Sequence, residues 1–133
     1  MREAETESAR FWLDDDGVMR AVAKPVNQTT EQAAENLRVF TELAGGTRRP
    51  VVIDTSQVKG LSREARAIYS GPQAARIWTA CARVVASSVI ARTLGNFIMA
   101  VSRPAFPTRM FETLDEALVW ARAHLARGEE SHG

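Results

Sequence analysis

Two short runs of apolar residues constrain this sequence more than any other feature. Residues 51–53 read Val-Val-Ile and residues 84–86 read Val-Val-Ala, with no polar residue inside either run. A strand that is buried on both faces of a sheet has this continuous pattern, whereas a strand with one face in water alternates apolar and polar side chains. The two runs therefore predict adjacent, central strands of a sheet that helices cover.

The residues before the first run predict a hairpin and a helix. Residues 9–13 and 18–23 are apolar stretches on either side of a turn that ends at Gly17, which favours an antiparallel pair. Thr29 and Gln32 have the spacing of a capping box, and Gly45 follows the last residue of the apolar helical stripe. This part of the chain is expected to fold as strand, strand, helix.

The residues after the first run predict three more helical segments and a last strand. Ser62 is a candidate N-cap for a helix that Gly71 and Pro72 interrupt, with a second piece expected to reach Trp78. Another helix is expected over residues 90–101, followed by a strand at residues 109–111. A second capping box, Thr113 with Glu116, begins a final helix with its core face expected at Leu114, Leu118, Ala121 and Leu125.

The predicted order is β-β-α-β-α-β-α-β-α, which indicates an α/β domain with a mixed central sheet covered by about four helices. A chain of 133 residues is long enough for one such core. Residues 1–8 and 128–133 are polar and without apolar periodicity, so we expect a flexible N-terminus, a domain over residues 9–127 and a flexible tail.

Charge and composition exclude several classes of protein. The formal net charge is +1, with basic residues scattered along the chain, so no field for nucleic acid is expected. The N-terminus lacks the basic and then apolar pattern of a secretory signal, and no apolar run approaches the roughly 20 residues that span a bilayer. The lone Cys81 cannot form an internal disulfide and is expected in the core. We expect a cytoplasmic protein with no transmembrane segment.

A search for catalytic constellations favours a protein that is not an enzyme. His124 and His132 have no ligand spacing with each other or with Cys81, so no metal site is expected. The acidic turn before Gly17 lacks the spaced ligands of a calcium loop. Gly45 and Gly46 lack the Lys-Ser or Lys-Thr of a phosphate-binding loop. No cofactor is expected.

Polar residues follow both apolar runs, and they are the candidate site. Asp54 ends the first run, at the edge where open α/β sheets place ligands, although the same carboxylate can simply accept turn hydrogen bonds. Ser62 has the same two interpretations, helix cap or modification site. Because the loops after parallel strands meet at one edge, a surface for partner binding or modification is predicted from these residues: Asp54, Ser56, Ser62, Ser87 and Ser88.

A family resemblance adds to this interpretation. It is carried by residues 51–56 (Val-Val-Ile-Asp-Thr-Ser), by the helix start at residues 61–66, and by the stretch from Leu94 through Phe111 to Trp120. With the order of elements, these segments resemble a STAS domain, and in particular its SpoIIAA-like branch, the fold of bacterial anti-sigma factor antagonists. The resemblance implies a regulatory module that binds a protein.

The resemblance departs at the turn that carries the phosphoacceptor in the anti-sigma antagonists. Counted forward from Asp54, the Asp of that turn falls on Ser62, and its two serines fall on Arg63 and Glu64. The usual phosphoacceptor is therefore missing, although Glu64 places a fixed negative charge in the same turn.

Two functions of different kinds remain open. The first is a non-catalytic, STAS-like regulatory module with a protein partner of unknown identity, and a homodimer is also open. The alternative is a carrier of a small apolar or lipid-like ligand, or a protein that associates with a membrane surface. A closed core with an exposed loop over residues 54–64 favours the first, whereas an apolar slot beside the helix at residues 89–101 favours the second.

Overall fold

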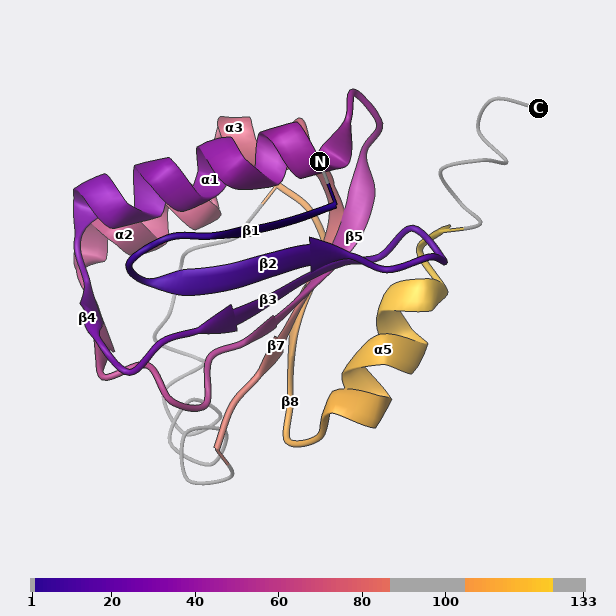
Figure 1. Ribbon diagram of the computed structural model, residues 1–133. Helices are drawn as coiled ribbons and strands as arrows, with labels where there is room; N and C mark the ends of the chain where they lie inside the picture. Colours follow the sequence, from indigo (N-terminus) through magenta and orange to yellow (C-terminus); the bar gives the residue numbers. More distant parts are fainter. Residues whose placement is uncertain (1, 87–104, 126–133) are drawn as a thin grey trace.

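The computed structural model describes residues 2–86 and 105–125, and its centre is one six-stranded sheet in the order β1-β2-β3-β5-β7-β8 (Figure 1). The first three strands pair antiparallel, and β3, β5, β7 and β8 pair parallel. The strands are β1 (Glu3–Glu5), β2 (Ala9–Leu13), β3 (Met19–Ala23), β5 (Arg49–Asp54), β7 (Trp78–Val84) and β8 (Thr108–Phe111). The predicted mixed α/β class is confirmed.

Helices lie on both faces of the sheet (Figure 1). One face carries α1 (Thr30–Ala44), α2 (Arg63–Tyr69) and α3 (Pro72–Ala75), and the other carries α5 (Leu114–Arg122). Two short strands, β4 (Asn27–Gln28) and β6 (Gly60–Leu61), form a separate parallel pair. This pair ties the segment before α1 to the segment before α2.

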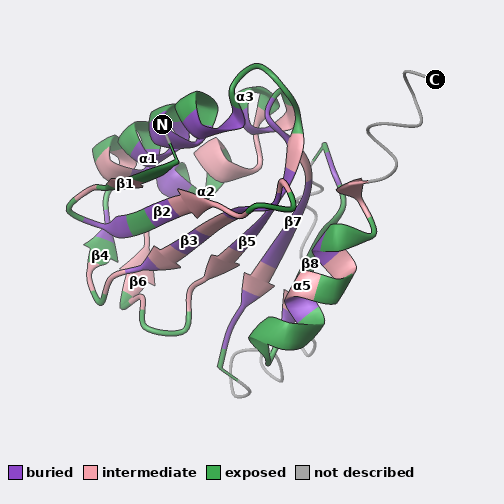
Figure 2. Ribbon diagram, turned by 45° about the vertical axis from the view of Figure 1, so that its right-hand side comes forward, coloured by how far each residue is buried: buried purple, intermediate pink, exposed green. Residues whose placement is uncertain are grey.

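The central position of β5 follows from its sequence, as predicted. Val51 packs with the cluster under α1, whereas Val52 packs with the cluster under α5, and both side chains are buried. β5 lies between β3 and β7, and burial runs through the middle of the sheet in Figure 2. β7 lies beside β5 as predicted, but the run at residues 84–86 overlaps this strand only at Val84, which pairs with Asp54. The part of β7 that lies opposite residues 51–53 is residues 81–83, and Ala86 is exposed, so the predicted strand is placed too far along the chain.

Capping residues and glycines in the sequence correctly predicted where several helices begin or end. Thr29 and Gln32 make the reciprocal capping box at the start of α1, and Gly45 ends that helix with φ at 64°. Gly17 closes the first hairpin with φ at 96°, a conformation that other residues rarely adopt. Ser62 caps α2, and Thr113 caps α5 by accepting from the Glu116 amide.

Two further segments differ from the sequence-based expectation. Residues 3–5, expected in a frayed terminus, form β1, because Glu5 pairs with Lys24 and the Leu13 amide donates to the Arg2 carbonyl. Trp78 begins β7 and does not end a helix, since α3 stops at Ala75 and the aromatic core takes up the indole.

The buried face of α5 agrees with the expectation except at its first residue. Ala121 is fully buried, and Leu118 and Leu125 pack against the same cluster, as expected. Leu114 is instead 38% exposed, and Ala117 is fully buried. The helix expected over residues 90–101 lies outside the described residues. Among the helices that are described, none is both long and apolar enough to cross a membrane.

Candidate functional site

The carboxyl end of β5 carries the first of the predicted site residues. One Asp54 carboxylate oxygen accepts from the Ser56 amide at 2.9 Å and from the Ser56 hydroxyl at 2.6 Å. This is a closed turn in which the carboxylate orders the start of the loop at residues 55–59. Ser56 itself is exposed. The geometry gives Asp54 a structural task, which was one of its two expected roles.

The other predicted site residues fall into two groups. The Ser62 hydroxyl accepts from the Ala65 amide at 3.1 Å and so begins α2. Its amide donates to the Gln28 carbonyl, which holds the loop against β4. Ser87 and Ser88 lie outside the described residues, so their expected place beside Asp54 stays a prediction.

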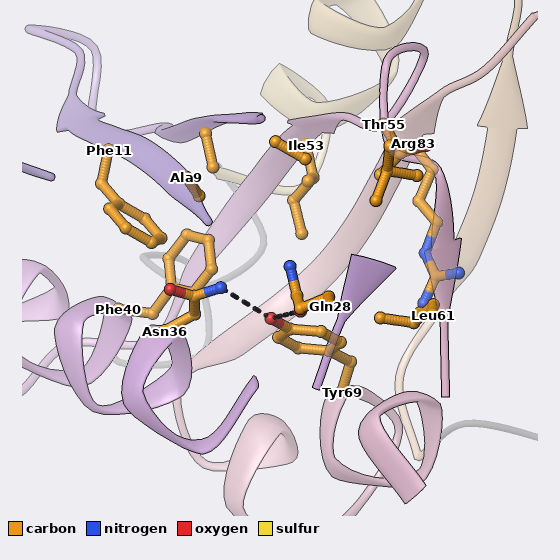
Figure 3. A pocket seen from close by; sticks show the side chains of 13 residues that line it. Ala9, Phe11, Gln28, Asn36, Phe40, Ile53, Thr55, Leu61, Tyr69 and Arg83 are labelled. Carbon is orange, nitrogen blue, oxygen red and sulfur yellow. Dashed lines mark hydrogen bonds between the residues drawn. The ribbon is translucent and has the colours of Figure 1, made fainter. Parts of the chain in front are cut away.

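A small cavity lies behind this loop, between the sheet and the α1–α2 layer (Figure 3). Its volume is about 50 Å³, and most of its wall is apolar. The loop supplies Thr55 and Val58 to the cavity wall, and β6 supplies Leu61, while Ser56 and Lys59 on the loop are exposed. One short segment therefore lines the cavity with one set of residues and meets solvent with another.

A buried hydrogen-bond network forms the polar end of the cavity (Figure 3). The Asn36 amide nitrogen donates to the Tyr69 hydroxyl at 3.1 Å and to the Ser8 hydroxyl at 2.8 Å. The Thr6 hydroxyl donates to the side-chain oxygen of Asn36 at 2.7 Å, and the Tyr69 hydroxyl donates to the side-chain oxygen of Gln28. The network joins α1, α2, β4 and the turn between β1 and β2, so it fixes the cavity's shape.

Burial changes the acidity of two groups beside the cavity. It raises the pKa of Tyr69 to about 12, against smaller lowering effects from the Asn36 hydrogen bond and the Arg83 charge. Burial also raises the pKa of the Cys81 thiol, again with Arg83 acting in the opposite direction. Tyr69 is therefore a neutral hydrogen-bonding group at physiological pH, and Cys81 is a core thiol and not a thiolate.

Among the described residues that line the cavity, Arg83 is the one that carries a charge. It lies on β7, and its half-buried side chain comes in beside Thr55 and Leu61 (Figure 3). A second cavity of about 180 Å³ shares Tyr69 and Arg83 with the first and adds Arg66, Ser70 and other residues. The Tyr69 phenol and the Arg83 guanidinium thus belong to the walls of both cavities.

The histidines are the remaining candidates for chemistry, and the described one, His124, is not among the residues that line these cavities. His124 packs against the Trp120 ring with centroids 4.6 Å apart, and His132 lies outside the described residues. Within residues 2–86 and 105–125, no group of three His, Cys, Asp or Glu side chains could hold a metal ion.

The sequence interpretation did not consider Gln28, Asn36, Tyr69 and Arg83 as a site. A signal was present, because Asn36 interrupts the apolar stripe of α1 and Arg83 interrupts an apolar strand. Polar residues at buried positions need partners, so such interruptions point to a network or a ligand. What the sequence does not show is that α1, α2, β4 and β7 bring them together.

Comparisons with known proteins bear on the fold more than on the chemistry. A family described as "Domain of unknown function (DUF7793)" matches residues 11–125. No protein of curated function matches the chain.

Two solved structures are similar. An uncharacterised protein of the DUF3478 family with a SpoIIAA-like fold, from Shewanella loihica PV-4, is 17% identical with a TM-score of 0.62, over 89% of this chain and 97% of that one. A protein with unknown function from Arthrobacter sp. fb24 is 27% identical over 90% and 96% of the two chains, with a TM-score of 0.34. The first of these supports the SpoIIAA-like fold that the sequence suggested.

Proposed function

The chain belongs to the DUF7793 family and has a SpoIIAA-like fold, and on this premise we propose that it is a non-catalytic regulatory module that binds a protein partner. The binding surface consists of the loop at residues 55–59 and the outer side of α2, and we call it the loop–α2 surface. The observation that carries the proposal is how little of α2 serves the core.

Ala65 is the only fully buried residue among the seven of α2. Arg63, Glu64, Arg66 and Ala67 are exposed, and Ile68 and Tyr69 are half-buried. A helix of this size usually buries a broader stripe against its sheet. The loop–α2 surface is nevertheless held rigidly, since Asp54, Ser62 and the β4–β6 pair fix both ends of the loop. A rigid, solvent-facing surface loses little entropy when a partner binds.

Charge narrows the kind of partner. The loop–α2 surface carries Lys59, Arg63 and Arg66 against one acidic residue, Glu64. A partner with an acidic patch would be guided to it by electrostatic attraction, and the association rate would fall with added salt. The phosphoacceptor serines of anti-sigma antagonists are absent here, so regulation by phosphorylation at that turn is not part of this proposal.

The test is affinity capture from the native cell extract, with proteins quantified by mass spectrometry. The bait is the wild type, Lys59→Glu/Arg63→Glu, or the matched control Arg10→Glu/Arg76→Glu, which reverses two exposed charges elsewhere. We expect a protein that the wild type and the control retain and that the loop–α2 variant loses by tenfold or more. The recovered partner is then purified, and its direct binding is measured with each variant.

Ser62→Asp adds a second arm that does not disturb folding. Aspartate caps a helix as well as serine does, so this variant keeps the start of α2 while it places a negative charge between the two parts of the loop–α2 surface. Weaker binding with an unchanged melting temperature supports the proposal. Equal retention of every captured protein by the wild type, Ser62→Asp and the loop–α2 double variant would contradict it.

A further inference from the structure

The buried hydrogen bonds between α1 and the sheet run in one direction, and Thr6 sets that direction. The Thr6 hydroxyl oxygen accepts from the Ser8 and Ala9 amides at 3.3 and 3.2 Å. Its own hydrogen is therefore available to donate, and the nearer of its two acceptors is the side-chain oxygen of Asn36, at 2.7 Å. Because that oxygen accepts, the side-chain nitrogen of Asn36 is the group that donates to the Tyr69 hydroxyl, at 3.1 Å.

Gln28 is the last group of this network and ends it with an unused donor. Since the Tyr69 hydroxyl accepts from Asn36, its hydrogen goes to the side-chain oxygen of Gln28. The side-chain nitrogen of Gln28 is left with two N–H groups, which donate to no atom of the described residues. Gln28 is only 6% exposed, and this nitrogen points toward Ile53 and into the cavity of about 50 Å³ (Figure 3). A buried donor aimed into a cavity indicates an acceptor there.

The cavity has room because three buried positions on β2 and β3 carry alanine. Ala9 and Ala23 lie opposite each other on these two strands. Ala21 lies opposite Phe11, and all three alanines belong to the cavity wall. A larger apolar side chain at any of these positions would take up part of the space. The Gln28 donor therefore faces a compartment with a mostly apolar wall.

From the free donor and the apolar wall we propose that the cavity binds a small, neutral carbonyl compound. Its oxygen accepts from the Gln28 side-chain amide, on the side of the cavity where Ile53 lies (Figure 3). Its apolar body packs against the alanines of β2 and β3. This site goes beyond the proposed partner binding and does not depend on it.

The size and polarity of the cavity set the class of ligand. A water-sized group needs about 10–15 Å³, so a volume of about 50 Å³ takes about four non-hydrogen atoms. A single water on Gln28 would leave most of that volume unfilled against an apolar wall. A carbonyl oxygen accepts from the amide without adding a donor of its own, which a hydroxyl or an ammonium group would add. An ionised ligand is disfavoured because it would leave water for this wall.

The experiment titrates the purified wild-type protein with propanone and follows it by two-dimensional NMR. The comparison probe is 2-methylpropene, which has nearly the same shape but no oxygen. Propanone should shift the signals of the Gln28 side-chain amide. Nuclear Overhauser contacts should join the propanone methyl groups to the alanine methyl groups of the wall, those of Ala9, Ala21 and Ala23.

Two variants separate the donor from the space. Gln28→Met keeps a side chain of similar length without N–H groups, so it should weaken propanone about 3- to 10-fold, the contribution of one hydrogen bond. The same variant should change the affinity for 2-methylpropene by less than about twofold, since that probe makes no hydrogen bond. Ala23→Val fills part of the cavity and should weaken both probes about 10-fold or more. Ala34→Val, at an exposed position of α1 outside the cavity, should weaken neither.

Several results would overturn the proposal. Equal weakening of both probes by Gln28→Met would show that the amide does not hold the oxygen. Equal affinities in Ala23→Val and Ala34→Val, or propanone shifts that avoid Gln28, would place the ligand elsewhere. Contacts in the ligand-free protein that put another part of the chain inside the cavity would leave no site. If a cavity variant does not fold, the wild-type shifts and methyl contacts decide the question by themselves. These readings need no protein partner, so they stand or fall separately from the loop–α2 surface.

Discussion

Asn36 shows how one buried polar residue can hold three segments together: α1, α2 and the turn between β1 and β2. Its side chain is 1% exposed and exchanges hydrogen bonds with Thr6, Ser8 and Tyr69. Asn36→Ala leaves those partners in a closed space, so we expect a loss of about 2 to 4 kcal/mol in the free energy of unfolding. Urea denaturation measures it, and Glu35→Ala, an exposed neighbour, should change stability by less than about 0.5 kcal/mol. A cost for Asn36→Ala equal to that control would mean that water replaces the network.

Tyr69 should make the folded protein less stable at alkaline pH. Its pKa of about 12 in the folded protein exceeds that of about 10 in the unfolded chain, so the unfolded chain loses this proton first. The stabilisation is complete below pH 10 and is lost as the pH rises toward 12, by about 2 to 3 kcal/mol. Tyr69 is the single tyrosine, so the absorbance of tyrosinate reports it alone.

The matched variant for this titration is Tyr69→Phe. It should flatten the loss of stability between pH 10 and 12, while the part that comes from the raised pKa of Cys81 remains. A tyrosinate midpoint near 10 in the folded wild type would show that the hydroxyl is open to solvent.

At the scale of elements, Gly45 ends α1 in the left-handed region, with φ at 64°. A Cβ there would meet nothing closer than the Leu43 carbonyl at 4.0 Å, so the cost of Gly45→Ala comes from the backbone and not from a clash. We expect Gly45→Ala to lose about 1 kcal/mol, and Gly45→Asn to lose less because asparagine tolerates this conformation. Thermal denaturation ranks the two variants. Equal losses would argue that the helix end shifts to avoid the strain.

Local chemistry explains which elements the sequence could predict. The Thr29–Gln32 box, the Gly45 stop and the Ser62 cap involve residues three or so apart, so they can be recognised without the fold. Trp78 was misplaced because a strand beginning with an aromatic residue resembles the end of an amphipathic helix. What decided its position was a distant environment, the rings of Phe40 and Phe106. The edge strand β1 depends in the same way on pairing with β2.

Some residues of the candidate site could be predicted from local sequence, and others could not. Asp54 and Ser62 could be singled out from position alone, since each lies at a strand end or a helix start. Arg83, Gln28 and Tyr69 could not be grouped, because their meeting depends on how α2 and the β4–β6 pair lie over β7. Polar interruptions of apolar patterns mark such residues individually, but only the packing shows that they share one cavity.

At the scale of the whole molecule, stability should decrease from the centre of the sheet to its edges. β5 is hydrogen-bonded on both sides, to β3 and β7, and is covered on both faces. β1 pairs only with β2, and two of its three residues are exposed. Amides exchange slowly where only global unfolding exposes them, so β5 and β7 should exchange most slowly and β1 most rapidly among the strands of this sheet.

A core substitution tests whether β5 and β7 report global unfolding. Val52 is 1% exposed, and Val52→Ala should lower the global free energy of unfolding by roughly 2 kcal/mol through lost burial and the cavity left behind. The opening free energy that hydrogen exchange reports should fall by the same amount at β5 and β7. It should hardly change at β1, which already opens locally. Val119→Ala, at a side chain 69% exposed, is the control and should change no strand. Hydrogen exchange followed by NMR gives each rate, and equal acceleration of β1 and β5 by Val52→Ala would mean that the edge strand unfolds only with the whole sheet.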